Sequence, residues 1–401
     1  MRKPLRLLRA LTMILVGLIL GLALLELGAR LFTRADPVAE NTWARRVLTH
    51  RHAGLLHMPD PILGWRNRPG VETDFESPEF RVHVRINDLG LRGAPVPKSP
   101  PSGRRRVLLV GDSFVFGWGV EEEQTFAAEL VRLLPELETV SMGVAGYGTD
   151  QELIWLRREG LALRPDLVVA CFYINDLIDN VSPVRWSHNK PTFRLGADGS
   201  LLETLPPAAP AAPARSEKPA PPAPAWPGER IDDWMVSHLR IYSLLRPRIA
   251  TLAVRAGWMT PEEGLDDYVA YFRRAASPAQ EAQWRLAEAE LAAMDQAARA
   301  QGARFAVLVV PAKVQVQKDV RARVLRAYGL RAADFDFGGP EERLAAWGRT
   351  AGVPVLTVHP DLERAAATRR LYYQFDGHWN REGHKAAAAA LARELDGLAR
   401  R

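Results

Sequence analysis

The sequence predicts an α/β fold with three layers, in which helices cover both faces of a central parallel sheet of five strands. Two observations predict it. Short runs of β-branched and aliphatic residues recur along the chain, and stretches with apolar residues at helical spacing separate them. Where strands and helices alternate in this way, the strands pair in parallel and the helices cover them.

Five apolar runs supply the predicted strands. They are residues 107–110, 138–144, 166–173, 304–310 and 353–358. The predicted helices lie around residues 126–134 and over 151–160 and 385–398, with Ala-rich helices before the last two strands. Before this domain, residues 80–86 alternate apolar and charged side chains as a half-exposed strand does, which predicts a small β extension.

We expect three parts along the chain. Residues 1–34 form an N-terminal tail and membrane anchor, 35–103 a stalk and the small β extension, and 104–401 the α/β domain. Residues 205–227 consist mainly of Pro and Ala, and they fall between the third and fourth predicted strands. We therefore interpret them, with helical sequence beside them, as an insertion within one domain.

The N-terminal segment is typical of a membrane anchor. Four basic residues, Arg2, Lys3, Arg6 and Arg9, precede the apolar run 10–25, and the stretch 7–25 provides the roughly 20 residues that a helix needs to cross a bilayer. The basic residues place the N-terminus in the cytoplasm. A cleaved signal peptide is the alternative, but Gly28-Ala29-Arg30 is a poor cleavage site. We expect a single-pass protein of a bacterial inner membrane, with the α/β domain in the periplasm.

The composition excludes several classes of function. The chain has 401 residues and a formal net charge of +6, but no dense basic tract interleaved with aromatic residues, so a nucleic-acid partner is not expected. The single cysteine, Cys171, excludes an intrachain disulfide and a paired-cysteine metal site. It lies in an apolar run, which predicts a small core residue.

The first predicted strand of the α/β domain delivers Ser113 onto a glycine-flanked turn. In open α/β sheets, ligands bind just beyond the carboxyl ends of the strands, where this serine falls. An Asp-Ser pair after a strand is also a common start of a helix. A serine hydroxyl is a poor nucleophile alone, so Ser113 requires a histidine base and an acid that orients that base.

One of the nine histidines has a suitable acid beside it. Asp376 precedes His378 by two residues, and in an extended segment such residues point the same way, so the carboxylate can reach the imidazole. The pair lies between the last predicted strand and the helix 385–398, for which Asn380 is a natural N-cap. The alternative is that both are ordinary turn residues at that helix start.

Two further loops can supply hydrogen-bond donors to an oxyanion. The glycines of 143–148, among them Gly146, follow the second strand and can present backbone N–H groups, and Asn175 follows the third strand with its side-chain amide. The alternatives are a simple turn and a helix cap. The glycine spacing does not match the dinucleotide-binding motif, so we expect no nucleotide site.

These residues resemble the SGNH, or GDSL-like, hydrolase family, whose four sequence blocks contribute Ser, Gly, Asn and His in this order. The resemblance covers roughly residues 104–398 without the Pro-rich insertion, and it implies a flavodoxin-like fold. It implies that Ser113 is the nucleophile, His378 the base and Asp376 its acid partner. It also implies an oxyanion hole formed by Ser113, Gly146 and Asn175, with no metal or organic cofactor.

The sequence departs from the family pattern at two places. Tyr173 stands where the family usually has Gly two residues before the Asn, which is expected to narrow the pocket beside Asn175. The spacing from Asp376 to His378 is one residue shorter than usual. With Trp379 it is similar to the Asp-x-His-Trp motif of alginate-type O-acetyltransferases, where the motif lies N-terminal to the serine.

We therefore expect a serine esterase that cleaves O-acyl esters, including O-acetyl esters, on a glycan or another cell-envelope component. An O-acyltransferase that uses the same residues is the first alternative. An inactive envelope scaffold that binds glycan is the second, and the intact Ser113, Asp376 and His378 argue against it.

Overall fold

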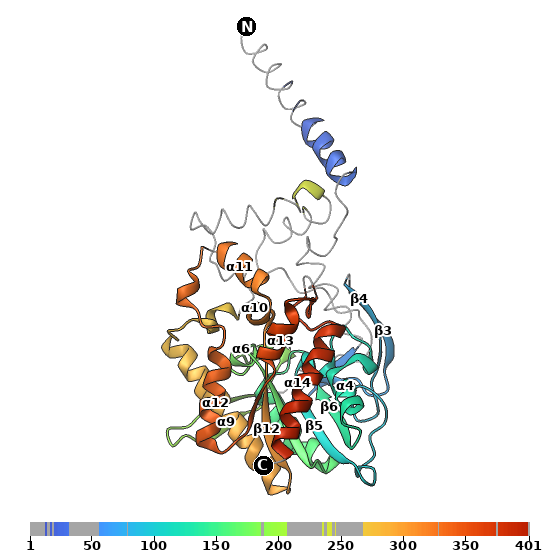
Figure 1. The fold of residues 1–401 in the computed structure, drawn as a ribbon, viewed down its shortest axis with the longest axis vertical. Helices are drawn as coiled ribbons and strands as arrows, with labels where there is room; N and C mark the ends of the chain where they lie inside the picture. The colour runs from blue at the N-terminus through green and yellow to red at the C-terminus, as the bar shows by residue number, and fades with distance from the viewer. Residues whose placement is uncertain are drawn as a thin grey trace. The chain divides into compact units, whose positions relative to one another are not determined.

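The structure, a computed structural model of the chain (Figure 1), describes part of the 401 residues. The described residues are 13, 17, 20–31, 56–77, 79–185, 188–206, 235, 239–242, 245, 268–327, 329–373 and 376–399. Contacts divide the chain into two compact units, one formed by 50–218 with 261–401 and the other by 1–49 with 219–260.

The larger unit is built on a parallel five-stranded sheet. The strands are β5 (Arg105–Gly111), β6 (Leu137–Gly143), β7 (Leu167–Tyr173), β12 (Arg304–Val310) and β13 (Val355–Thr357), in the order β13-β12-β7-β5-β6. Gly111 lies opposite both Gly143 and Cys171, so β5, β6 and β7 end close to one line. The loops that follow these strands therefore meet at one edge of the sheet.

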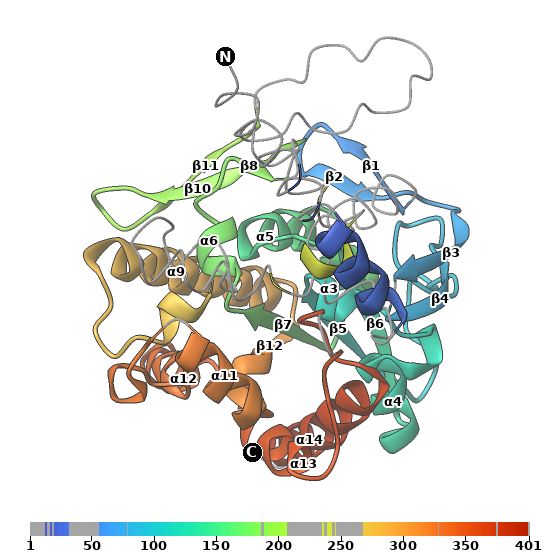
Figure 2. The ribbon, with the colours of Figure 1, turned by 90° about the horizontal axis from the view of Figure 1, so that it is seen from above.

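Helices lie on both faces of this sheet, as Figure 2 shows. One face carries α5 (Thr149–Arg158) and α9 (Pro278–Ala300), and the other carries α4 (Phe126–Leu133) and α14 (Arg381–Ala399). In the described part of the larger unit, the other helices of at least eight residues are α11 (Lys318–Ala327), α12 (Gly339–Ala351) and α13 (His359–Ala366). The predicted three-layer α/β arrangement is confirmed.

The strand interiors are apolar because both faces of the sheet are covered. Residues Val107, Leu108, Leu109 and Val110 of β5 are at most 2% exposed. Cys171, in β7, is buried without a disulfide partner, as its apolar setting predicts.

The last strand is shorter than the predicted 353–358. Strand β13 covers only Val355–Thr357 and lies at the edge of the sheet. Pro354 has no N–H to donate, and it joins the sheet only through its carbonyl, which accepts from Val307 N at 2.9 Å. A proline before the strand therefore delays regular pairing, as is typical of an edge strand.

A β extension precedes the first strand of the sheet. It contains two antiparallel hairpins, β1 (His57–Asp60) with β2 (Gly64–Asn67), and β3 (Glu72–Ser77) with β4 (Phe80–Arg85). We call residues 56–93 the N-terminal extension. In β4 the burial alternates along the strand, with Val82 and Val84 buried and their neighbours exposed, which matches the alternating sequence.

Four short strands that the sequence did not predict precede the insertion. They are β8 (Val184–Arg185) with β9 (His188–Asn189), and the hairpin β10 (Thr192–Leu195) with β11 (Leu201–Thr204). Nearly all of the predicted Pro- and Ala-rich insertion 205–227 lies outside the described residues, as does most of the stalk.

The predicted anchor 7–25 also lies largely outside the described residues, although 20–31 are helical. Within the part of the chain that the structure describes, no helix is both long enough and apolar enough to span a membrane.

Candidate active site

The nucleophile candidate lies at a sharp junction between strand and helix. Strand β5 ends at Gly111, and the four-residue helix α3 (Ser113–Phe116) begins two residues later. Asp112 caps this helix, because its Oδ1 accepts a hydrogen bond from Phe114 N at 2.8 Å. A side chain at Gly111 would lie 2.4 Å from Cγ2 of Val115, so the close turn requires glycine.

This junction satisfies both interpretations of the Asp-Ser pair. Asp112 is the helix cap, and Ser113 is the first helical residue, 8% exposed at the carboxyl end of β5. Asp112 caps the helix and Ser113 carries the hydroxyl at the strand end, so the two interpretations are not alternatives here.

The structure brings Ser113, His378 and Asp376 together. Ser113 Oγ lies 2.6 Å from His378 Nε2, and His378 Nδ1 is hydrogen-bonded to Asp376 Oδ1. The side chains of His378 and Asp376 are 24% and 16% exposed. We call these three residues the catalytic trio, because their bonds run from hydroxyl to imidazole to carboxylate as nucleophilic serine chemistry requires.

The predicted extended conformation of the Asp376–His378 segment is wrong. The chain bends there, and Asp376 Oδ1 accepts from both the backbone N of His378, at 2.8 Å, and the ring Nδ1. This is an Asx-type turn, in which an aspartate binds the backbone two residues on. The turn holds the His378 imidazole against the Asp376 carboxylate. The two side chains therefore meet although only one residue separates them in the sequence.

A group of aromatic rings lies beside the imidazole. The Phe114 ring centroid lies 5.0 Å from that of His378 and 4.9 Å from that of Trp379. Tyr173, the residue that replaces the family's glycine, lies 4.6 Å from Phe114 between centroids and is 7% exposed. The tyrosine therefore packs against the residue that follows Ser113.

Gly146 lies in the loop after β6, and the residues 142–150 around it are buried. Its φ of 78° is in the left-handed region, which an L-residue with a side chain rarely adopts. Since Gly143 pairs with Gly111 in the sheet, this loop follows β6 beside the β5–α3 junction. Its position is compatible with presenting a backbone N–H near Ser113.

Asn175 follows β7 and precedes the short helix α6 (Asp176–Asp179), but its side chain does not cap that helix. Instead, Nδ2 donates to Asp112 Oδ2 at 3.3 Å and to Asp179 Oδ2 at 3.1 Å. The amide is buried, and the contact to Asp112 is longer than an ordinary hydrogen bond of about 2.9 Å. The helix-cap interpretation is wrong, and the amide is held between two carboxylates.

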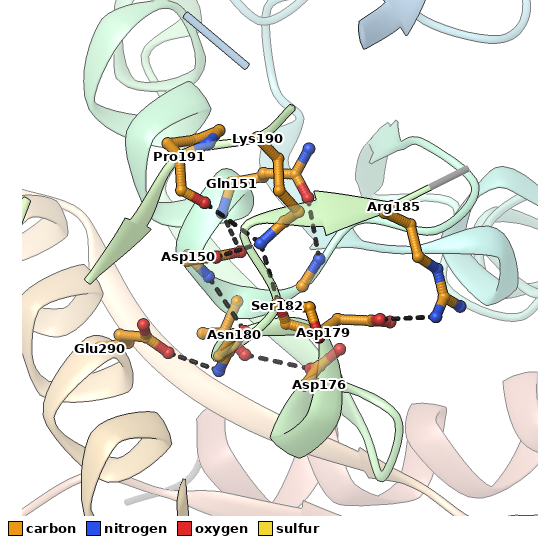
Figure 3. Close-up of polar contacts among 12 residues, drawn as sticks. Asp150, Gln151, Asp176, Asp179, Asn180, Ser182, Arg185, Lys190, Pro191 and Glu290 are labelled. Carbon is orange, nitrogen blue, oxygen red and sulfur yellow. Dashed lines mark hydrogen bonds and ion pairs between the residues drawn. The ribbon is translucent and has the colours of Figure 1, made fainter. Parts of the chain in front are cut away.

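Sequence reasoning missed a group of buried charges beside this asparagine, shown in Figure 3. We call it the buried charge network, and its members are Asp150, Asp179, Asn180, Arg185, Lys190 and Glu290. Lys190 Nζ forms an ion pair with Asp150, and neither side chain is exposed to solvent. The Lys190 amine also donates to the carbonyl of Asp179 at 2.9 Å.

The network continues from this ion pair toward Asn175. Arg185 Nη1 lies 2.8 Å from Asp179 Oδ1, the carboxylate that also accepts from Asn175. Asn180 Nδ2 donates to Glu290 Oε2 at 2.5 Å, which connects α9 to the network. The segment after β9 and helix α9 are thus tied by polar contacts to the loop that carries Asn175.

Burial dominates the electrostatics of these carboxyl groups. It raises the pKa of Asp179 to about 7, although Arg185 and Lys190 act in the opposite direction. Burial also raises the pKa of Asp112 and holds the pKa values of Asp176 and Glu290 well above the ordinary range. The region therefore retains protons that exposed carboxyl groups would release. Among the described residues, no group of three or more His, Cys, Asp or Glu is arranged to hold a metal ion.

Comparison with known proteins places these features in one family. The sequence profile of the GDSL-like Lipase/Acylhydrolase family matches residues 109–386, a span that contains Ser113, Gly146, Asn175, Asp376 and His378. No curated protein matches the chain.

Several solved structures are similar to the chain. A lipolytic protein of the G-D-S-L family from Desulfitobacterium hafniense DCB-2 is 12% identical over 73% of this chain and 100% of its own, with a TM-score of 0.36. TesA is 14% identical over 73% and 99%, with a TM-score of 0.36. The acetyl xylan esterase AlAXEase is 11% identical over 73% and 98%, with a TM-score of 0.37. At such scores the family assignment rests on the sequence match.

Proposed function

Because the chain belongs to the GDSL-like lipase/acylhydrolase family and is an ester-cleaving hydrolase, we propose that Ser113 is its nucleophile, with His378 as base and Asp376 as the orienting acid. The observation that carries the proposal is the 2.6 Å contact between Ser113 Oγ and His378 Nε2, backed by the bond from His378 Nδ1 to Asp376. A serine held in this way is activated for attack on an acyl carbonyl.

The reaction proceeds in two halves. Ser113 Oγ attacks the carbonyl carbon while His378 Nε2 takes the hydroxyl proton, and the imidazolium then gives this proton to the leaving alcohol as the ester bond breaks. In the second half, His378 takes a proton from water while the water oxygen attacks the acyl carbon, and the imidazolium returns this proton to Ser113 Oγ as the bond to the acyl group breaks and the acid leaves. Asp376 keeps the proton on Nδ1 and stabilises the imidazolium throughout.

Three donors are proposed for the oxyanion, namely the backbone N–H groups of Ser113 and Gly146 and the side-chain amide of Asn175. The geometry of Asn175 supports its part. Its contact with Asp112 is the longer of two, at 3.3 Å, so an oxyanion can take the place of Asp112 as acceptor while the 3.1 Å bond to Asp179 keeps the amide in place.

We assign the substrate to O-acyl esters, including acetyl esters, carried by a glycan or another cell-envelope component. The N-terminal sequence supports a substrate in the cell envelope, since basic residues precede the apolar stretch 7–25. In this proposal the stretch is a single inner-membrane anchor, and the enzyme domain lies in the periplasm. Membrane fractionation of cells that produce the full chain tests the anchor: recovery of the chain in the soluble fraction would contradict it.

The proposal is tested by hydrolysis of a panel that contains p-nitrophenyl acetate, longer p-nitrophenyl esters and acetylated oligosaccharides. Ser113→Ala should lower kcat at least about 1000-fold on every ester that the wild type cleaves. A Ser113→Ala protein that keeps most of its activity would contradict the assignment of the nucleophile.

Acyl transfer to a sugar hydroxyl is the second candidate, favoured by the Asp-Gly-His-Trp sequence at 376–379. It forms the same acyl-serine, but a sugar hydroxyl in place of water then attacks the acyl carbon and releases Ser113. Mass spectrometry of a reaction with acyl donor and oligosaccharide separates the two: acylated sugar indicates transfer, and free acid as the sole product indicates hydrolysis.

A further inference from the structure

The N-terminal extension lies outside the family match, which begins at residue 109, yet it contacts three segments of the candidate site. These segments are the glycine loop after β6, the end of helix α3 and the loop that carries Asp376. Hairpins that only cover a sheet edge need no such contacts with three separate loops.

The glycine loop is held by β2. Trp65 Nε1 donates to the carbonyl of Ala145 at 3.1 Å, and Asn67 Nδ2 donates to that of Gly143 at 3.0 Å. Trp65 and Asn67 are both at most 1% exposed. The backbone on either side of Val144, next to Gly146, is therefore fixed by buried side chains of the extension.

The end of the nucleophile helix is held by Arg92. Its guanidinium donates to the carbonyls of Phe116, at 3.0 Å, and of Gly117 and Val120, both at 2.6 Å. These include carbonyls that a helix leaves unpaired at its C-terminus. Since α3 has only four residues, Arg92 fixes the turn whose first residue is Ser113.

The loop that carries Asp376 is held by the β3–β4 hairpin. Glu79 Oε2 accepts a hydrogen bond from Asp376 N at 2.7 Å, and the Phe80 ring lies 5.1 Å from that of Tyr373. Asp376 in turn binds both His378 N and Nδ1. The backbone position of Asp376 therefore decides where the imidazole points, and Glu79 fixes that position.

We propose that the N-terminal extension acts on the catalytic trio through Glu79, a positioning residue that holds the Asp376–His378 turn in line with Ser113. The inference rests on the proposed function of the catalytic trio. Glu79 acts on Asp376 through a backbone hydrogen bond, so the reach of its oxygen matters more to this contact than its charge.

The test compares kcat and KM for p-nitrophenyl acetate hydrolysis among full-length variants. Glu79→Ala and Glu79→Asp should each lower kcat about 10- to 100-fold, since neither presents an oxygen at the same reach, with KM within about twofold of wild type. Glu79→Gln should keep most of kcat, because its amide oxygen accepts the same N–H. A general loss of hairpin structure would not distinguish Gln from Asp.

Asp74→Ala is the matched control. Asp74 lies on the same hairpin, is half exposed and bonds Arg81 and His83, both within the hairpin. It should leave kcat unchanged. Equal rates for wild type, Glu79→Ala and Glu79→Asp would overturn the inference, as would equal losses for Asp74→Ala and Glu79→Ala. Ser113→Ala separates a failure of the proposed function from a failure of the role of Glu79. If Ser113→Ala remains active, the proposed function has failed. If Ser113→Ala is inactive and Glu79→Ala is fully active, only the role of Glu79 is rejected.

Discussion

The catalytic trio and the buried charge network both place carboxylates beside basic side chains, but their paired side chains differ in how much surface is exposed to solvent. His378 and Asp376 keep 24% and 16% of their side-chain surface exposed, whereas Lys190 and Asp150 keep none. A group that moves protons to a substrate must be reachable, and a fully buried ion pair is not. The contrast is therefore between two pairs: the pair proposed for proton transfer keeps part of its surface exposed, and the Lys190–Asp150 ion pair is fully buried.

The largest expected effect belongs to the trio. His378→Ala should lower kcat at least about 1000-fold, because Ser113 loses the group that accepts its proton. The free energy of unfolding should change by less than about 1 kcal/mol, since the ring is partly exposed. Ester hydrolysis and urea unfolding of the same preparation measure both quantities. If His378→Ala loses as much stability as a core substitution does, the contrast between the catalytic trio and the buried charge network is contradicted.

The network should show the opposite pattern. Lys190→Met leaves Asp150 buried without its partner, which is expected to cost about 3–5 kcal/mol of the free energy of unfolding. The kcat of the folded protein should stay within about threefold of wild type. Urea unfolding measures the first quantity, and hydrolysis measured well below the unfolding midpoint measures the second.

The double variant Lys190→Met with Asp150→Leu is the control for this prediction. Replacing both charges by apolar groups removes the unpaired carboxylate, so much of the lost stability should return. If the double variant is less stable than Lys190→Met, the ion pair is not the reason for the loss.

A third prediction is a pH dependence of stability carried by Asp179. Its pKa is raised by burial to about 7 in the folded protein, from an ordinary value of 3.8, so the folded state holds a proton that the unfolded state has released between these values. Wild type therefore loses stability from this group as pH rises from about 4 to 7. The Asp179→Asn variant has no carboxyl group to titrate at this position. The Tm of wild type minus that of the variant should therefore fall across this range. A difference that rises or stays flat would contradict a raised pKa.

Much of the fold was predictable because it depends on local patterns. Apolar runs located all five strands of the sheet within a few residues, and β13 was overestimated because the strand begins after Pro354 and ends at Thr357. The site residues were predictable for the same reason. Ser113, Gly146 and Asn175 each follow a strand of the sheet within a few residues, and Asp376 and His378 lie between helices α13 and α14 in a segment with its own short signature.

The buried charge network was not predictable because its partners come from distant parts of the sequence. Asn180 and Glu290 lie on different elements, and charged residues such as Lys190 resemble any solvated surface residue in the sequence. The contact of Glu79 with Asp376 has the same character. Neither pairing leaves a periodic or spaced pattern, so tertiary structure alone reveals it.

The most direct test of the central claim, that His378 and Asp376 activate Ser113, is mass spectrometry of the chain after reaction with a fluorophosphonate. The account predicts one adduct, on the peptide that contains Ser113, in wild type, and labelling at least about 100 times slower in His378→Ala. Modification at another residue, or equal labelling rates in the two proteins, would contradict it.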